Sequence, residues 1–137
     1  MRTLALDIGS VRIGVAVSDP LGLFAQGIGV WRADSDWRLA LDDCIKKYKP
    51  STLLIGLPVR TTGEKGIEAE RILRIAEEIQ SSYPEIKIET WDERFTTAIA
   101  EQVLLEADVS RNKRRQNIDK LAAVVILQSW LEKSKTF

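Results

Sequence analysis

Three carboxylates stand where the surrounding sequence pattern disfavours a charge. Asp7 interrupts an apolar run, Glu93 directly follows a predicted strand, and Asp119 heads the apolar stripe of a predicted helix. Each has a simpler interpretation: a turn cap for Asp7, a surface ion pair with Arg94 for Glu93, and a favourable helix-start position for Asp119. Burial of a charge requires a partner. Together, the three acids therefore indicate a site that holds divalent cations.

The rest of the composition narrows the chemistry that these acids can perform. The chain has no histidine and a single cysteine, Cys44, which excludes Ser-His-Asp triads, Cys-His pairs and histidine-bearing zinc or iron sites. Ligation by oxygen alone suits Mg²⁺ or Mn²⁺. Two such ions activate a water and stabilise the leaving oxygen in phosphodiester cleavage without a histidine base. The sequence therefore predicts a Mg²⁺ or Mn²⁺ site at Asp7, Glu93 and Asp119.

A basic segment lies next to the third acid. Between Ser110 and Lys120 the chain has five basic residues against Asp119 alone. The first turn of a helix slightly disfavours cations, whereas a bound phosphate gains from both the helix dipole and the arginines. An ordinary solvated helix face is the alternative. We expect the segment to contact a nucleic-acid backbone in a salt-dependent manner, through Arg111, Lys113, Arg114 and Arg115.

Alternating and helical hydrophobic patterns predict the elements that must position these residues. The predicted strands are Thr3–Ile8, Val11–Ser18, Leu23–Trp31, Thr52–Leu57 and Ile86–Trp91. A helix is predicted from the stripe between Trp37 and Tyr48, and others over Ile67–Ser81, Thr96–Ala107 and Lys113–Glu132. The order βββαβαβαα predicts an α/β fold with a five-stranded mixed sheet, an antiparallel meander followed by parallel strands, flanked by helices. In such sheets, sites form where strand ends meet helix starts.

The length and net charge of the chain limit the number of its domains and the kinds of partner that it can attract. The chain has 137 residues, of which 45% are hydrophobic. Residues 1–137 are therefore expected to form a single domain. Twenty basic and twenty acidic residues cancel, so any attraction to nucleic acid must be local. The longest uncharged stretch has 12 residues, too short to span a membrane. With its single cysteine, the chain is expected to be a cytoplasmic protein without membrane contact.

Several motifs follow one another along nearly the whole chain: Leu4–Gly9, Arg12–Asp19, Gly56–Pro58 with Gly63, Asp92–Thr97 and Ile118–Ala123. Together, and in this order, they resemble the YqgF/RuvX family of bacterial ribonuclease-H-like proteins. One position and one four-residue stretch depart from the usual pattern. Phe95 replaces a common leucine, and Val59–Thr62 departs from the family's Asn-x-Asp type of stretch, so no substrate contact is assigned to the 56–66 loop.

The resemblance implies a ribonuclease-H-like fold and metal-binding acids at Asp7, Glu93 and Asp119. Asp92 competes with Glu93, because only the side chain on the correct face of the strand end reaches the metals. The family resembles Holliday-junction resolvases in fold and has been linked to maturation of the 5′ end of 16S ribosomal RNA.

We therefore expect a hydrolase: a Mg²⁺- or Mn²⁺-dependent nuclease that acts on structured RNA, foremost precursor 16S ribosomal RNA. One alternative is a Holliday-junction resolvase acting on branched DNA, which calls for a dimer because two symmetry-related strands must be cut. A second is a catalytically silent RNA-binding factor in ribosome assembly. The sequence leaves open whether the protein is a monomer or a homodimer.

Overall fold

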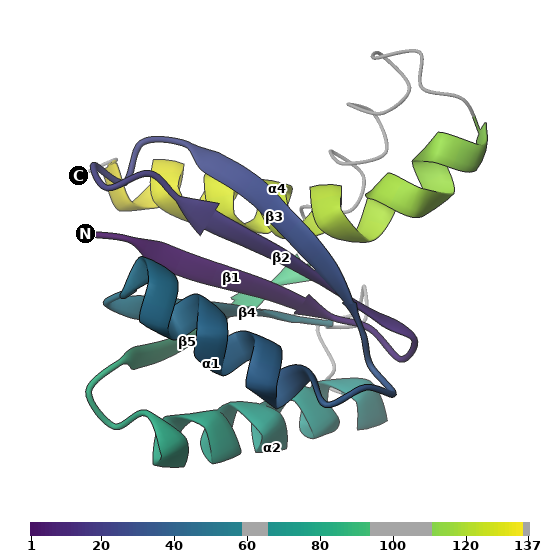
Figure 1. Ribbon diagram of the computed structural model, residues 1–137, viewed down its shortest axis with the longest axis horizontal. Helices are drawn as coiled ribbons and strands as arrows, with labels where there is room; N and C mark the ends of the chain where they lie inside the picture. The colour runs from purple at the N-terminus through teal and green to yellow at the C-terminus, as the bar shows by residue number, and fades with distance from the viewer. Residues whose placement is uncertain (59–65, 94–110, 136–137) are drawn as a thin grey trace.

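A mixed five-stranded sheet forms the centre of the part of the chain that the computed structural model describes, residues 1–58, 66–93 and 111–135. Side chains of residues 111–120, 134 and 135 lie outside that description. The strand order is β3-β2-β1-β4-β5. The strands are β1 (Thr3–Ile8), β2 (Arg12–Ser18), β3 (Ala25–Arg32), β4 (Thr52–Leu57) and β5 (Lys87–Asp92). This confirms the predicted α/β fold with a mixed sheet (Figure 1).

The antiparallel half of the sheet is a meander of β1, β2 and β3. In the first turn, the Gly9 N–H donates to the Arg12 carbonyl oxygen over 2.9 Å, and a Cβ on Gly9 would lie 2.8 Å from that oxygen. The turn therefore requires glycine. The strand β3 begins two residues later than predicted, because the Asp19 Oδ1 accepts the N–H groups of Leu23 and Phe24 and holds them in the second turn.

The parallel half joins β1 to β4 and β4 to β5. Every residue from Thr52 to Leu57 in β4 is buried, as expected of a strand covered on both faces. The strand β5 begins one residue later than predicted, because the Ile86 N–H donates to the Tyr83 carbonyl oxygen in a turn. The carboxyl ends of β1, β4 and β5 consequently meet at one edge of the sheet.

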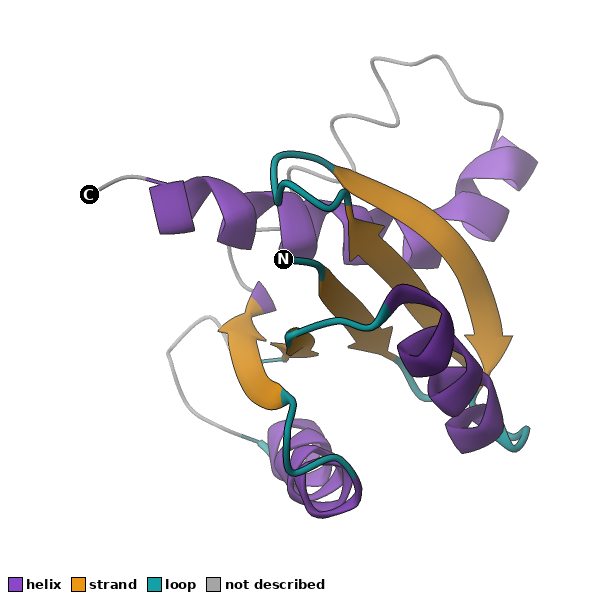
Figure 2. Ribbon diagram, turned by 60° about the vertical axis from the view of Figure 1, so that its left-hand side comes forward, coloured by secondary structure: helices purple, strands orange, loops and turns teal. Residues whose placement is uncertain are grey.

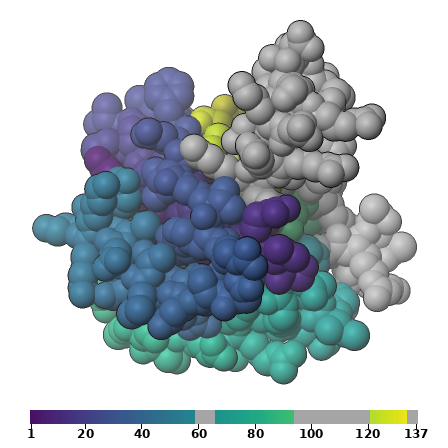
Figure 3. Space-filling view, turned by 45° about the vertical axis from the view of Figure 1, so that its right-hand side comes forward, coloured from purple at the N-terminus to yellow at the C-terminus, as the bar shows by residue number. Residues whose placement is uncertain are grey.

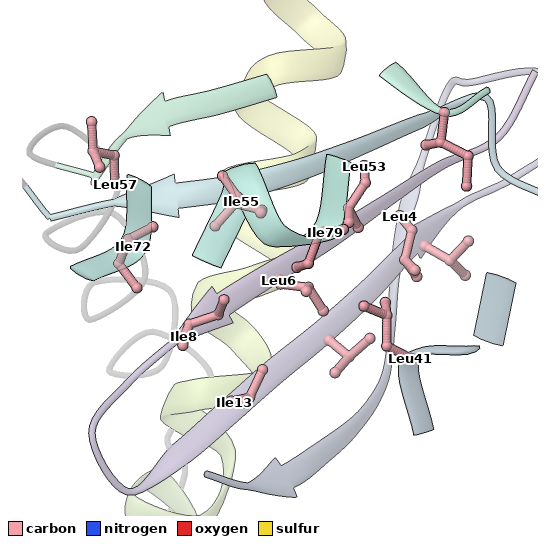
Figure 4. Packing of buried hydrophobic residues seen from close by; sticks show 14 of the residues in the cluster. Leu4, Leu6, Ile8, Ile13, Leu41, Leu53, Ile55, Leu57, Ile72 and Ile79 are labelled. Atoms are coloured by element: carbon pink, nitrogen blue, oxygen red, sulfur yellow. The ribbon is translucent and has the colours of Figure 1, made fainter. Parts of the chain in front are cut away.

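One face of the sheet is covered by α1 (Trp37–Tyr48) and α2 (Ile67–Ser82), as Figures 1 and 2 show. The residues predicted to face inward from α2 are buried: Ala69, Ile72, Ala76 and Ile79. Figure 4 shows Ile72 and Ile79 above the strands, beside side chains such as Leu6 and Ile55. The helix α1 ends at Lys49, which has a left-handed φ of 49° and donates its N–H to the Ile45 carbonyl oxygen.

The opposite face is covered by α4 (Arg111–Lys135), which packs across β1, β2 and β3. Ala123, Ile126 and Leu127 are buried there against small or branched strand residues that include Ala5 and Leu54. The helix extends beyond the predicted Lys113–Glu132 at both ends. The predicted helix Thr96–Ala107 lies outside the described residues. Among the described helices, none is both long enough and apolar enough for a membrane span.

Candidate metal and nucleic-acid site

Asp7 lies near the carboxyl end of β1, opposite Gly14 of β2, and is partly buried. Side chains alternate between the two faces of a strand. The neighbours Leu6 and Ile8 pack under α1 and α2, whereas Ala5 belongs to the cluster under α4. Asp7 therefore projects from the face that α4 covers, at the edge where the parallel strands end.

Glu93 directly follows β5 and turns its carboxylate toward the same face. Its Oε1 lies against the position that a Cβ on Gly56 would occupy, and the Ile126 Cδ1 of α4 lies 2.8 Å from that position. Glu93 and Asp7 are joined by a side-chain hydrogen bond. The structure therefore brings together two acids that lie 86 positions apart in the sequence.

The register of β5 separates Asp92 from this pair. Asp92 pairs with Leu57 across the β4–β5 ladder, and the Leu57 side chain belongs to the cluster under α1 and α2. Paired residues of neighbouring strands project to the same face of a sheet. Asp92 thus projects away from Asp7, although its charge is near enough to affect Glu93.

The Glu93 environment disfavours a negative charge. Burial is the largest cause, and the hydrogen bond with Asp7, the Asp7 charge and the Asp92 charge add to it, raising the pKa of Glu93 from 4.5 to about 9. Two carboxylates in contact cannot both ionise without a proton or a cation between them. At neutral pH the metal-free protein therefore holds a proton on Glu93 that is donated to Asp7.

This donor set fits a hard divalent cation. Carboxylate oxygens are the ligands that Mg²⁺ and Mn²⁺ prefer, and a cation between the two acids supplies the positive charge that the proton otherwise provides. Among residues with described side chains, no group of three or more His, Cys, Asp or Glu gathers in a metal-holding arrangement. The third predicted ligand, Asp119, has a described helical backbone in α4, but its side chain lies outside the description.

The predicted phosphate-contacting residues fall in the first turns of α4. Arg111, Lys113, Arg114 and Arg115 have a helical backbone, and their side chains lie outside the described part of the chain. Figure 1 shows the amino-terminal part of α4 on the side of the molecule where β1 ends. The helix carries no acidic residue in its first turn, the place where a negative charge interacts favourably with the helix dipole.

Two nearby residues, Gly56 and Arg71, are not among the site residues that the sequence predicts. Gly56 leaves room for Glu93, and a signal existed, because a glycine inside an otherwise apolar strand often marks a close approach. Nothing in the sequence distinguishes Arg71 from the other charged residues of α2. Its Nη2 lies 3.5 Å from the Gly9 carbonyl oxygen and 3.2 Å from the Glu68 Oε2.

The turn between β1 and β2 is accessible from solvent. In Figure 3 the purple surface of this turn is exposed beside the teal surface of α2. Arg71 therefore places a guanidinium beside the turn that follows the strand of Asp7. Residues 59–65 of the predicted loop 56–66 lie outside the description.

Comparison with known structures agrees with this architecture. The "Fowlpox virus resolvase" in complex with "substrate Holliday junction DNA" is 14% identical, with a TM-score of 0.65 over 99% of this chain and all of that one. The Thermus thermophilus RuvC structure with a Holliday junction substrate is 10% identical, with a TM-score of 0.56 over 99% of this chain and 97% of that one. The fold is therefore the ribonuclease-H-like fold of these resolvases.

Sequence comparison finds much nearer relatives. The chain is 45% identical over 135 residues to a Staphylococcus aureus (strain JH9) protein named "Putative pre-16S rRNA nuclease", covering 96% of this chain and 95% of that protein. A protein of the same name from Staphylococcus aureus strain N315 matches equally. The family described as "RuvX: Holliday junction resolvase" matches residues 1–133. Because the match covers the strands and helices that build the acidic site, the chain belongs to the RuvX family.

Proposed function

We propose that this protein is a divalent-metal-dependent nuclease that hydrolyses phosphodiester bonds in structured RNA and matures the 5′ end of precursor 16S ribosomal RNA. The observation that carries the proposal is the contact between Asp7 and Glu93 at the carboxyl edge of a ribonuclease-H-like sheet. Relatives 45% identical over nearly their whole length carry the name of such a nuclease. Nuclease chemistry at this site requires no histidine, which the chain lacks.

In this proposal Asp7 and Glu93 hold Mg²⁺ or Mn²⁺, and Asp119 of α4 completes the set of ligands. When bound, the metal supplies Lewis acidity that activates a water and stabilises the leaving oxygen. Asp7 and Glu93 contribute a negatively charged pair from two strands whose backbones the sheet holds in register. That rigidity keeps the acids together before substrate arrives.

Arg111, Lys113, Arg114 and Arg115 bind the phosphate backbone in the same proposal. Arginine pairs with phosphate through two parallel hydrogen bonds, and the amino terminus of α4 adds the favourable end of the helix dipole. Because no net charge steers the whole molecule, this segment provides the attraction to RNA. Substrate contact is thereby confined to the edge of the sheet that carries the acids.

We further propose that residues 1–137 form one nuclease domain that acts in the cytoplasm, where precursor ribosomal RNA is processed in bacteria. A trimming nuclease needs a single site, so a monomer suffices for this activity. Cleavage of a four-way junction requires two sites at a fixed separation. The observation that favours this second activity is the structural likeness to a resolvase solved with junction DNA.

A direct experiment separates these activities. Purified protein is offered Mn²⁺ with either a precursor 16S ribosomal RNA fragment or a four-way DNA junction, and products are resolved by electrophoresis. We expect cleavage near the 5′ end of the mature RNA, at least about a hundredfold reduced in Asp7→Asn. That variant keeps the side-chain volume and one acceptor oxygen, but it replaces the other carboxylate oxygen with an NH₂ donor and removes the negative charge.

The remaining outcomes are equally informative. Paired cleavage of the junction without cleavage of the RNA identifies a resolvase. Cleavage of neither substrate, together with retained RNA binding, supports a catalytically silent assembly factor. Undiminished metal-dependent cleavage by Asp7→Asn contradicts the proposed site.

A further inference from the structure

Gly56 occupies the only position in β4 without a side chain, and the structure shows why. A Cβ built there would collide with the Glu93 Oε1, would lie 2.9 Å from the Glu93 carboxyl carbon, and would lie 2.8 Å from the Ile126 Cδ1. Real Cβ atoms do not approach other heavy atoms this closely. The Glu93 carboxylate thus fills the space that a side chain at residue 56 would need.

The surroundings allow few ways to relieve such a collision. The backbone of β4 is fixed on one side by β5, where Gly56 pairs with Trp91, and on the other by β1, where Ile55 pairs with Leu6. Ile126 is 1% exposed and packs with α4 against the sheet. Because β4 is paired on both sides and the Ile126 side chain is buried, the group that can move is the partly exposed Glu93 side chain.

Movement of that side chain breaks the contact on which the acidic site depends. Glu93 reaches Asp7 across the intervening strand β4, directly over Gly56. A methyl group at residue 56 lifts the carboxylate away from the sheet and from Asp7. Aspartate at residue 93, which is one methylene shorter than glutamate, leaves room for that methyl group.

We propose that Gly56 is a positioning residue, which seats the Glu93 carboxylate against Asp7 by providing the space above β4, so that residues 56 and 93 act as a size-matched pair. This inference deepens the proposed function, because it names a determinant of the metal-binding geometry. It makes a specific claim: a side chain at residue 56 is compatible with an aspartate at residue 93 but not with a glutamate.

The first arm of the test uses the metal-free protein. Thermal unfolding in EDTA is measured for wild type, Gly56→Ala, Glu93→Asp and the double variant. We expect Gly56→Ala to lower the melting temperature by about 5 °C or more, since overpacking a buried site is destabilising. The double variant should melt within about 2 °C of Glu93→Asp alone, because the collision is gone.

A matched control tests whether a strand glycine with space around it tolerates alanine. Among the described residues, the Trp31 Nε1 is the one atom near a Cβ built on Gly29 of β3, and its distance of 3.9 Å is an ordinary contact. Gly29→Ala should therefore change the melting temperature by less than about 2 °C and leave metal binding unchanged. If melting-temperature losses of Gly56→Ala and Glu93→Asp simply add in the double variant, the two residues are not size-matched and the inference is wrong.

The second arm measures Mn²⁺ affinity from the electron paramagnetic resonance signal of free Mn²⁺. Gly56→Ala should bind at least about tenfold more weakly than wild type, as expected when a charged ligand is displaced. The double variant with Glu93→Asp should bind Mn²⁺ at least about threefold more tightly than Gly56→Ala alone. Retention of wild-type Mn²⁺ affinity, within twofold, by Gly56→Ala would overturn the inference.

A further variant guards against a folding defect. Gly56→Ala/Ile126→Val removes the Cδ1 methyl group that the new Cβ meets but keeps Glu93. It should regain part of the melting temperature without regaining Mn²⁺ affinity. If wild type itself binds no Mn²⁺, the proposed function fails, and the metal-free measurements alone decide whether Gly56 positions Glu93.

Discussion

Glu93 is the residue whose surroundings most clearly oppose its charge. Burial and the contact with Asp7 raise the pKa of Glu93 to about 9 in the metal-free protein. In the unfolded chain the same group titrates near its ordinary value of 4.5. The folded protein therefore binds a proton on Glu93 that the unfolded chain releases across this interval of pH.

This difference predicts how metal-free stability depends on pH. A carboxyl group with a raised pKa stabilises the folded state when protonated, fully below pH 4.5, and this contribution is lost as the pH rises through about 9. We expect urea unfolding in EDTA to show a free energy of unfolding that decreases from pH 5 to pH 9. Glu93→Gln, which cannot ionise, should show a much flatter dependence.

The decisive quantity is the difference between wild type and Glu93→Gln in the pH dependence of the free energy of unfolding, because other groups titrate in both proteins. Parallel pH profiles of wild type and Glu93→Gln would show that Glu93 ionises normally in the folded state. Such a result would also contradict the close contact with Asp7. Saturating Mg²⁺ should reverse the wild-type slope, because the metal binds the deprotonated pair.

The choice of acid at this strand end illustrates what residue patterns can and cannot predict. Asp7 is recognisable in the sequence because it interrupts the apolar run of a strand. Asp92 and Glu93 are adjacent, and both suit a metal. The pairing of Asp92 with Leu57 assigns Asp92 to the opposite face, and that register depends on contacts with β4 that the local sequence does not contain.

Among the secondary structure elements, α4 combines a face that packs on the sheet with the basic segment. Its middle part packs on the sheet through Ala123, Ile126 and Leu127, while its first turns carry the basic segment. Because Ile126 also lies beside the Glu93 carboxylate, the helix that is proposed to bind phosphate also borders the acidic pair.

The basic segment leads to a prediction about salt. Each phosphate contact releases counterions, so the logarithm of RNA affinity should fall with the logarithm of salt concentration by roughly 0.7 to 0.9 per contact. Arg114→Ala and Arg115→Ala should each weaken binding of precursor RNA and flatten this slope by about that amount. Fluorescence anisotropy over a series of KCl concentrations measures both effects.

Lys46, in the last turn of α1, provides a matched control for the salt experiment. Lys46 forms an exposed ion pair with Asp42 at 2.8 Å and lies on the helix layer opposite α4. Lys46→Ala removes one positive charge without touching the basic segment, so its salt slope should match wild type. Equal slopes for Lys46→Ala, Arg114→Ala and Arg115→Ala would place the RNA elsewhere on the surface.

Elements with strong periodicity were predicted almost to the residue. The helix predicted over Ile67–Ser81 extends over Ile67–Ser82, and β1 and β4 have the predicted bounds. The strand β2 begins one residue later than predicted, at Arg12. The strands β3 and β5 also begin late, because hydrogen bonds in turns delay the start of the strand. Those bonds depend on how the turn closes, which hydrophobic patterning does not encode.

At the scale of the whole molecule, the proposed ligands come from distant parts of the chain. Asp7 lies in the first strand, Glu93 follows the last strand, and Asp119 belongs to the final helix. A metal that binds the folded arrangement and not the unfolded chain stabilises the fold. The proposed metal binding therefore predicts that metal affinity and global stability are linked.

This linkage predicts a shift in melting temperature with metal. Mn²⁺ at about a hundred times its dissociation constant contributes about 2.7 kcal/mol, which for a domain of this size raises the melting temperature by roughly 10 °C. Differential scanning calorimetry with Mn²⁺ and with EDTA measures the shift. Asp7→Asn should show little of it, and an equal shift in both proteins would mean that the metal binds at another place.

The sequence by itself determined the class of chemistry and the order of elements. Its lack of histidine restricts the acid-base and metal groups largely to carboxylates, and its hydrophobic periods predict a mixed α/β sheet. Only the tertiary structure decided that Glu93 reaches Asp7 over Gly56 while Asp92 faces away. The physical reason is that strand register and the approach of α4 depend on long-range pairing, and a shift by one residue would exchange the two acids between faces.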